Sequence, residues 1–170
     1  MKIKVRIHTN KWEELRERNA KAKGAQVRVG VFGSETHEGT DLTLVELAAI
    51  HEFGSPAANI PERSFIRRTL DAKHDEIKKY LKEAAKSVVE GKTPLQRALN
   101  LLGTWAAREI KKTITQGPGI PPPLRPATIA HKKSSRPLVD TGQLKNAITY
   151  VVVGSEGETP EHGQPEGAHE

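Results

Sequence analysis

The sequence predicts a single α+β domain, in which a small mixed sheet packs against a long antiparallel helical hairpin. Two tandem segments between residues 64 and 117 repeat apolar residues at the spacing of a helix face. Three segments, at residues 2–8, 26–32 and 147–153, alternate or cluster aliphatic residues as strands do. The chain of 170 residues has room for one modest core, which we assign to residues 1–153.

The two tandem segments are the centre of the predicted fold. The apolar face of the first comprises Ile66, Leu70, Ile77, Leu81, Ala84 and Val88. That of the second comprises Leu95, Ala98, Leu102, Trp105, Ala106 and Ile110. The short connection between them predicts an antiparallel pair with facing apolar surfaces. The first helix would span about 39 Å if unbroken; two helices broken near Asp71 are the alternative.

The elements before this pair follow from local signals. We expect a short helix at Lys11–Ala22, followed by the strand at Gln26–Phe32. A polar loop, Gly33–Thr40, leads into a second helix from Asp41 to Gly54, where glycine favours termination. Prolines and an asparagine make Ser55–Glu62 an extended connector to the long helix.

The segments after the pair differ in composition. Residues 118–137 hold six of the eleven prolines and four Lys or Arg without any acidic residue, which predicts an extended, exposed basic arm. Asp140 is expected to cap a short helical turn before the last strand. Residues 154–170 contain five glutamates, no Lys or Arg and almost no aliphatic residue, so we expect a disordered acidic tail.

The charge of the domain favours an acidic partner. The whole chain carries a net charge of +6, but without the acidic tail residues 1–153 carry 27 basic and 16 acidic side chains, a net charge of +11. Such a body suits nucleic acid or an acidic protein surface, and charge alone does not choose between them. Because only 35% of residues are hydrophobic, we expect association between subunits to contribute to stability.

Several classes of function lack sequence support. The absence of cysteine excludes disulfide and thiolate chemistry. No apolar run approaches the ~18 residues of a membrane span and no signal peptide is visible, so we expect a protein made in the cytoplasm with no membrane partner. His37-Glu38 and His51-Glu52 begin like a zinc-protease motif but lack its second histidine. A hydrolase using His51 and Glu52 is a weak alternative, and we expect no enzyme, metal or cofactor.

The basic arm is the best candidate for nucleic-acid contact. It contains no aromatic residue for base stacking, which disfavours sequence-specific or single-strand recognition. Non-specific contact with phosphates is compatible with its composition. A solvated basic loop, or one that docks on an acidic protein, explains the same residues equally well.

Two motifs resemble a known family. The first reads EFG…IPERSF over Glu52–Phe65, and the second reads PL.DTGQL…ITY over Pro137–Tyr150. With the helix at 98–114, they resemble the neck and tail-completion proteins of long-tailed double-stranded DNA bacteriophages over roughly residues 26–153. The resemblance implies a non-enzymatic virion protein that forms a ring, with a hexamer expected, at the head-proximal end of the tail tube. Its partners would be further copies of itself, the adjacent head–tail connector, the tail tube or terminator proteins, and the genomic DNA that passes through the ring.

The resemblance also implies which residues contact partners. Subunit or partner contacts are expected at Phe53, Gly54, Pro61, Phe65, Pro123, Leu124, Asp140, Thr141, Gly142 and Leu144. Plain packing and turn geometry are the favoured alternative for the motif residues, since glycine and proline serve this purpose in any fold. Contacts with a neighbouring ring or with DNA are expected at Arg125, Lys132, Lys133 and Arg136. The alternative functions are a tail terminator of the same assembly and a free, sequence-independent DNA-binding protein.

Overall fold

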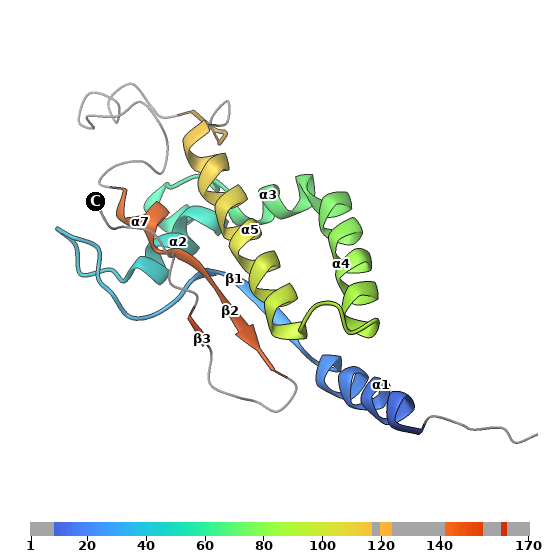
Figure 1. Ribbon diagram of the computed structural model, residues 1–170. Helices are drawn as coiled ribbons and strands as arrows, with labels where there is room; N and C mark the ends of the chain where they lie inside the picture. The colour runs from blue at the N-terminus through green and yellow to red at the C-terminus, as the bar shows by residue number, and fades with distance from the viewer. Residues whose placement is uncertain (1–8, 117–119, 124–141, 155–160, 163–170) are drawn as a thin grey trace, which may run out of the picture.

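The computed structural model shows a domain that mixes helices with a small antiparallel sheet (Figure 1). It describes residues 9–116, 120–123, 142–154 and 161–162. The α+β class expected from the sequence is confirmed. The strand expected at residues 2–8, most of the basic arm and most of the acidic tail lie outside the described residues.

The sheet is built from segments near the two ends of the described chain. Strand β1 (Gln26–Val31) pairs antiparallel with β2 (Ile148–Val153), so that Val29 lies opposite Tyr150. Both strands were predicted. A two-residue strand, β3 (Glu161–His162), pairs antiparallel with the other edge of β2. The prediction of a mixed sheet is therefore wrong for the described strands, because both of their pairings are antiparallel.

Strand β3 also corrects one prediction for the C-terminal region. Residues 154–170 were expected to be disordered because they lack aliphatic side chains, yet the structure pairs two of them with β2. The backbone N–H and C=O groups on a strand edge can pair with any chain, whatever its side chains. Composition therefore could not reveal this pairing.

The N-terminal helices follow the prediction with shifted boundaries. Helix α1 spans Thr9–Ala22, and α2 spans Leu44–Phe53. The second helix begins three residues later than predicted because Thr43 is its N-cap: the Thr43 hydroxyl accepts from the Glu46 amide at 3.2 Å, and the Glu46 carboxylate accepts from the Thr43 amide at 2.9 Å. The expected extended connector instead contains a 3₁₀ helix, η1 (Pro56–Ala58), inside a loop closed by a bridge between Ser55 and Ile60.

The long first helix of the predicted pair is broken. Helix α3 spans Ile66–Ala72 and α4 spans His74–Val89, with Lys73 between them at φ −103° and ψ 9°. The prediction of one unbroken helix is wrong, and the alternative of two helices broken near Asp71 is confirmed. The Lys73 amide still donates to the Thr69 and Leu70 carbonyls at 3.1 and 3.2 Å, so the break costs little hydrogen bonding.

Helix α5 (Leu95–Gln116) lies across one face of the sheet, with α3 beside it (Figure 1). Helix α5 approaches β2 closely at Gly103, where a Cβ atom would collide with the Tyr150 ring. Helix α4 contacts α5 through the Tyr80 hydroxyl, which donates to the Ala98 carbonyl at 2.9 Å. The most deeply buried residue of α5, Ile110, belongs to the core that α5 shares with the sheet.

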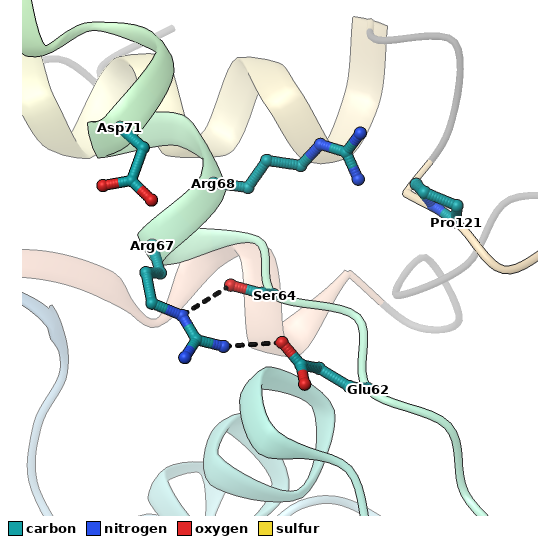
Figure 2. A pocket seen from close by; sticks show the side chains of 6 residues that line it. All are labelled: Glu62, Ser64, Arg67, Arg68, Asp71 and Pro121. Atoms are coloured by element: carbon teal, nitrogen blue, oxygen red, sulfur yellow. Dashed lines mark hydrogen bonds and ion pairs between the residues drawn. The ribbon is translucent and has the colours of Figure 1, made fainter.

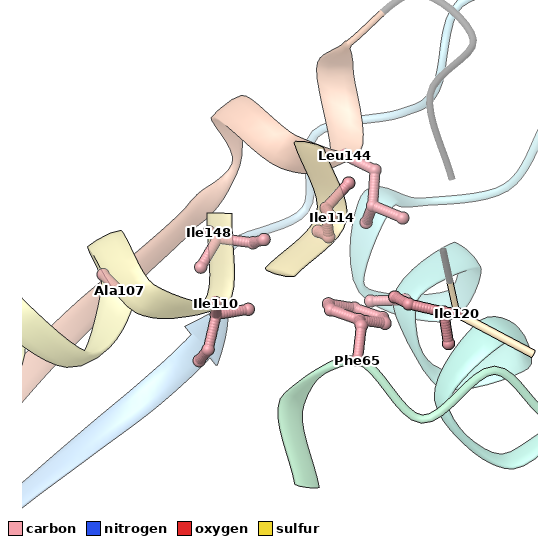
Figure 3. Close-up of a cluster of buried hydrophobic side chains, with 8 residues drawn as sticks. Phe65, Ala107, Ile110, Ile114, Ile120, Leu144 and Ile148 are labelled. Atoms are coloured by element: carbon pink, nitrogen blue, oxygen red, sulfur yellow. The ribbon is translucent and has the colours of Figure 1, made fainter. Parts of the chain in front are cut away.

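The core connects segments that are far apart in sequence (Figure 3). Its three fully buried large side chains are Phe65, Ile110 and Ile148. The cluster is completed by Ala48, Ala107, Ile114, Ile120 and Leu144. Ile120 follows α5, and only 4% of its surface is exposed, so the start of the predicted arm is anchored inside the domain.

Candidate interaction site at the junction of α2 and α3

The first motif, Glu52–Phe65, folds as a junction that joins the end of α2 to the start of α3. At its centre is the buried carboxylate of Glu52. This carboxylate accepts from the Ser64 hydroxyl at 2.8 Å and from the Ile66 and Arg67 amides at 2.9 Å. It thereby pairs backbone N–H groups that the first turn of a helix leaves without partners, and its negative charge suits the positive end of the helix dipole.

Gly54 allows the chain to turn away from α2. Its φ of 76° lies in the region that favours glycine. A Cβ atom at this position would lie 2.8 Å from the Glu62 amide nitrogen and 3.1 Å from the Ile60 carbonyl oxygen. Gly54 therefore lets the loop return close to the end of α2, which brings Ser64 to the Glu52 carboxylate.

Arg63 fastens the start of the arm to this junction. Its amide donates to the His51 carbonyl at 2.7 Å, and its guanidinium Nε donates to the Pro122 carbonyl at 3.1 Å. Only 7% of the residue is exposed, and this burial lowers the pKa of the guanidinium from its very high ordinary value. Together with buried Ile120, this bond holds the described start of the predicted arm, residues 120–123, against the domain.

A shallow cleft of about 300 Å³ opens on the surface beside the junction (Figure 2). Figure 2 shows Arg68 extending toward Pro121, while Arg67 points toward Ser64 and Glu62. The Arg67 guanidinium lies 2.6 Å from the Glu62 carboxylate. It also lies 5.5 Å from the centroid of the Phe53 ring, within the range of a cation–π contact.

The chemistry of this cleft suits a protein partner better than a phosphate. Two arginines, Arg67 and Arg68, are balanced by Glu62 and Asp71 on the same lining. The neighbouring Phe53 ring is 66% exposed although it is large and apolar. An exposed aromatic ring with arginine beside it is a combination enriched in protein–protein interfaces.

The structure separates the predicted contact residues of the first motif into two groups. Phe53 and Pro61 are exposed, as a contact surface requires, and Gly54 is half-buried at the turn. Phe65 is fully buried in the core, so the packing interpretation describes it and the expected partner contact does not.

The predicted contact residues in the arm and in the second motif are described only in part. Pro123 is exposed. Leu144 is buried in the core, which corrects the contact expected there. Gly142, at φ 80°, is the N-cap residue of α7 (Gln143–Asn146), the position that was predicted for Asp140. The other predicted contact residues lie outside the described part of the chain: Leu124, Asp140, Thr141, Arg125, Lys132, Lys133 and Arg136.

The hydrolase alternative finds no added support at Glu52. Both carboxylate oxygens are occupied by hydrogen bonds at the start of α3, which gives this residue a structural role. Within the described ranges, no group of three or more His, Cys, Asp or Glu side chains is arranged to hold a metal ion.

Sequence reasoning missed the parts that Glu52 and Arg63 play in the junction. Glu52 was read as part of a motif and as half of an incomplete metal pair, although it precedes a helix start by 14 residues. The available signal was Arg63 itself, a charged residue three positions before the start of a helix at Ile66. Its partner, the Pro122 carbonyl, lies 59 positions away and cannot be inferred from local pattern.

Comparison with known proteins finds no matching family model, no similar curated protein and no similar solved structure. Among the described helices, none combines the length and the hydrophobicity that crossing a membrane requires.

Proposed function

We propose that this chain is a structural virion protein of the phage neck or tail-completion type. It forms a ring at the head-proximal end of the tail tube, joins head to tail and lets DNA pass. The observation that supports this best is the Arg63–Pro122 hydrogen bond, which holds the start of a basic, proline-rich segment beside a cleft whose Arg67 contacts the exposed Phe53 ring. In this proposal the domain offers the cleft beside Phe53 to one neighbour and extends the basic segment toward another.

A ring follows from contacts of this kind. When the arm of one subunit binds a different surface on the next, the interface is heterologous, and such interfaces generate closed rings when the rotation closes. Proline has already restricted the arm, so ordering it on a neighbour costs less entropy than ordering a flexible chain. Strand β1 offers a further site, because among the described strands it pairs on one side only.

The proposal includes specific partners and a place in the particle. The partners are further copies of the chain in a hexameric ring, the adjacent head–tail connector, and the tail tube or terminator proteins. The extended arm and the packing of α4 on α5 as an antiparallel hairpin stay predictions within this proposal. The activity lies in contacts between subunits and requires no reacting group.

A tail terminator of the same assembly is the nearest alternative, and it differs in which neighbour the ring binds. A free DNA-binding protein is the other alternative, favoured by the net charge of +11 over residues 1–153. Tight, steeply salt-dependent binding of DNA by a monomer that never assembles would favour this second alternative.

Complementation tests the proposed function directly. Deleting the gene from the phage that encodes the chain should yield separate heads and tails, and supplying the protein in trans should restore joined particles. A variant with Arg125→Gln, Lys132→Gln, Lys133→Gln and Arg136→Gln should restore far fewer infectious particles while its melting temperature stays unchanged.

The matched control replaces four exposed lysines of α4 by glutamine: Lys78, Lys79, Lys82 and Lys86. It removes the same charge from a helical surface and should complement normally. Normal particle numbers from the arm variant would contradict the role of the arm. Joined particles from the deletion itself would contradict the proposed function.

A further inference from the structure

A second cleft, of about 560 Å³, lies between the C-terminal half of α5 and α7. The two elements lie side by side although 26 residues separate the end of one from the start of the other (Figure 1). Helix α5 contributes Arg108, Lys111 and Lys112 to the lining, and α7 contributes Lys145. In contrast to the cleft beside Phe53, this one gathers cations.

The one acidic residue in the lining, Glu109, offsets only a part of this positive charge. Its carboxylate lies 3.7 Å from the Arg108 Nε and 3.8 Å from the Lys73 Nζ, so its charge is already shared with α3–α4. Its side chain is only 11% exposed. Among the residues that the structure describes, no ion pair involves Lys111, Lys112 or Lys145.

The surroundings of Lys111 disfavour its positive charge and would favour a nearby anion. The residue is half-buried, and this burial, together with the charge of Lys145, lowers the pKa of its ammonium group. Two like charges are therefore held near each other in a partly desolvated place, which costs free energy. An anion bound beside both ammonium groups would offset their repulsion.

The spacing of the cations favours a chain of phosphates over a single carboxylate. Arg108 and Lys112 are four residues apart on a helix, a rise of about 6 Å. One strand of a duplex presents a phosphate about every 3.4 Å along the axis, so with α5 along the duplex this rise corresponds to about two steps from phosphate to phosphate. The other lining residues, Thr115 and Asn146, are polar, and no aromatic side chain is available for base stacking.

We infer that the cleft between α5 and α7 binds the phosphate backbone of double-stranded nucleic acid without regard to sequence. Lysine and arginine contacts to phosphates position a protein on a duplex and carry no sequence information. The inference goes beyond ring formation, since one chain can bind a duplex through this cleft without assembling. A chain that forms rings but has no affinity for a duplex would overturn this inference and leave the ring proposal standing.

The test is a salt titration of duplex binding. Fluorescence anisotropy with a labelled duplex of random sequence gives the slope of log Kobs against log[salt], and each lost phosphate contact reduces its magnitude by about 0.9. The double variant Lys111→Gln/Lys145→Gln should reduce the magnitude by about 2, and Lys112→Gln alone by about 1. The control, Lys78→Gln/Lys82→Gln, removes the same charge from exposed positions outside the cleft and should leave the slope unchanged.

The results of this titration distinguish duplex binding in the cleft from diffuse attraction and from binding of a carboxylate-rich partner. A reduced slope confined to the cleft variants supports the inference, with an unchanged melting temperature showing that they remain folded. Equal losses in the cleft and control variants would show diffuse attraction to the basic body and overturn it. Two competitors at matched charge test the ligand: inorganic polyphosphate should displace the duplex from the same residues, whereas tighter binding by a peptide of residues 155–170 would reassign the cleft to a carboxylate-rich partner.

Discussion

At the scale of single residues, the first motif describes a junction whose parts depend on one another. Gly54 brings the loop back, Ser64 and Glu52 then cap α3, and Arg63 secures Pro122. Each residue type suits its position: a carboxylate at a helix N-terminus, glycine at a positive φ, and an arginine whose long side chain reaches the Pro122 carbonyl. The residue types of the first motif are therefore accounted for by their structural roles in this junction.

Replacing Glu52 by alanine should destabilise the domain strongly. The variant leaves the Ile66 and Arg67 amides and the Ser64 hydroxyl without their partner, and the loss of these three partly buried hydrogen bonds should reduce the free energy of unfolding by about 2–4 kcal/mol. Urea denaturation measures it. The control Glu62→Ala removes an exposed ion pair with Arg67 and should cost less than about 1 kcal/mol. Equal losses in the two variants would contradict the capping role of Glu52.

Gly54→Ala should be costly for two separate reasons. The positive φ strains any residue with a Cβ atom, and this Cβ would press against the backbone of Glu62 and Ile60. We expect the free energy of unfolding to fall by about 2–4 kcal/mol. Gly33, at φ 95° with nothing within 4 Å of the added Cβ, isolates the first cost, so Gly33→Ala should lose only about 1 kcal/mol. Thermal or urea unfolding that ranks the two variants the other way would refute the close approach at Gly54.

At the scale of elements, the sequence predicts most helices and the two long strands, because periodicity and local capping residues determine them. The break at Lys73 could not be chosen from the pattern, since Ile66, Leu70 and Ile77 continue at helical spacing through it. Hydrogen bonds also continue nearly unbroken there, as Ile77 donates to the Lys73 carbonyl at 2.9 Å. We attribute the break to packing, because α3 contacts α5 and its Ile66 packs against the core cluster.

Other errors at this scale share a cause. Strand β3 pairs through backbone groups, and the contact residues Phe65 and Leu144 turn out to be buried by segments from distant parts of the chain. The basic cleft likewise joins Lys111 to Lys145, which are 34 positions apart. Local sequence records which residues suit a helix or a strand, but not which distant surfaces meet.

The contact between α4 and α5 makes a prediction that depends on pH. Tyr80→Phe removes the hydrogen bond to the Ala98 carbonyl and should lower the free energy of unfolding by about 1 kcal/mol at neutral pH. Burial raises the pKa of the Tyr80 hydroxyl, so the folded state holds this proton more tightly than the unfolded state. The contribution of the Tyr80 hydroxyl to the free energy of unfolding is fully present below the ordinary tyrosine pKa of about 10. It is lost as the pH rises through the folded-state pKa.

Urea denaturation between pH 8 and 11 measures this effect. The difference in stability between the original chain and Tyr80→Phe should shrink as the pH rises through this window. A difference that stays constant with pH would contradict the burial of the Tyr80 hydroxyl against α5.

At the scale of the whole molecule, the described surface divides its charges by place. The cleft beside Phe53 balances arginines with acids, while the cleft between α5 and α7 carries four basic residues and one shared carboxylate. A ring subunit that holds neighbours on one surface and faces a polyanion on another needs this division. The division supports the proposed function, and the two surfaces can be mutated independently.

Electron microscopy of the purified chain, alone and mixed with tail tubes, tests the central claim most directly. The account predicts closed rings of one size with rotational symmetry, seated at one end of each tube. Replacing exposed Phe53 by serine should abolish these rings while leaving the monomer folded, whereas Trp12→Ser on exposed α1 should not. A chain that stays monomeric alone and leaves the tube ends bare would contradict the account.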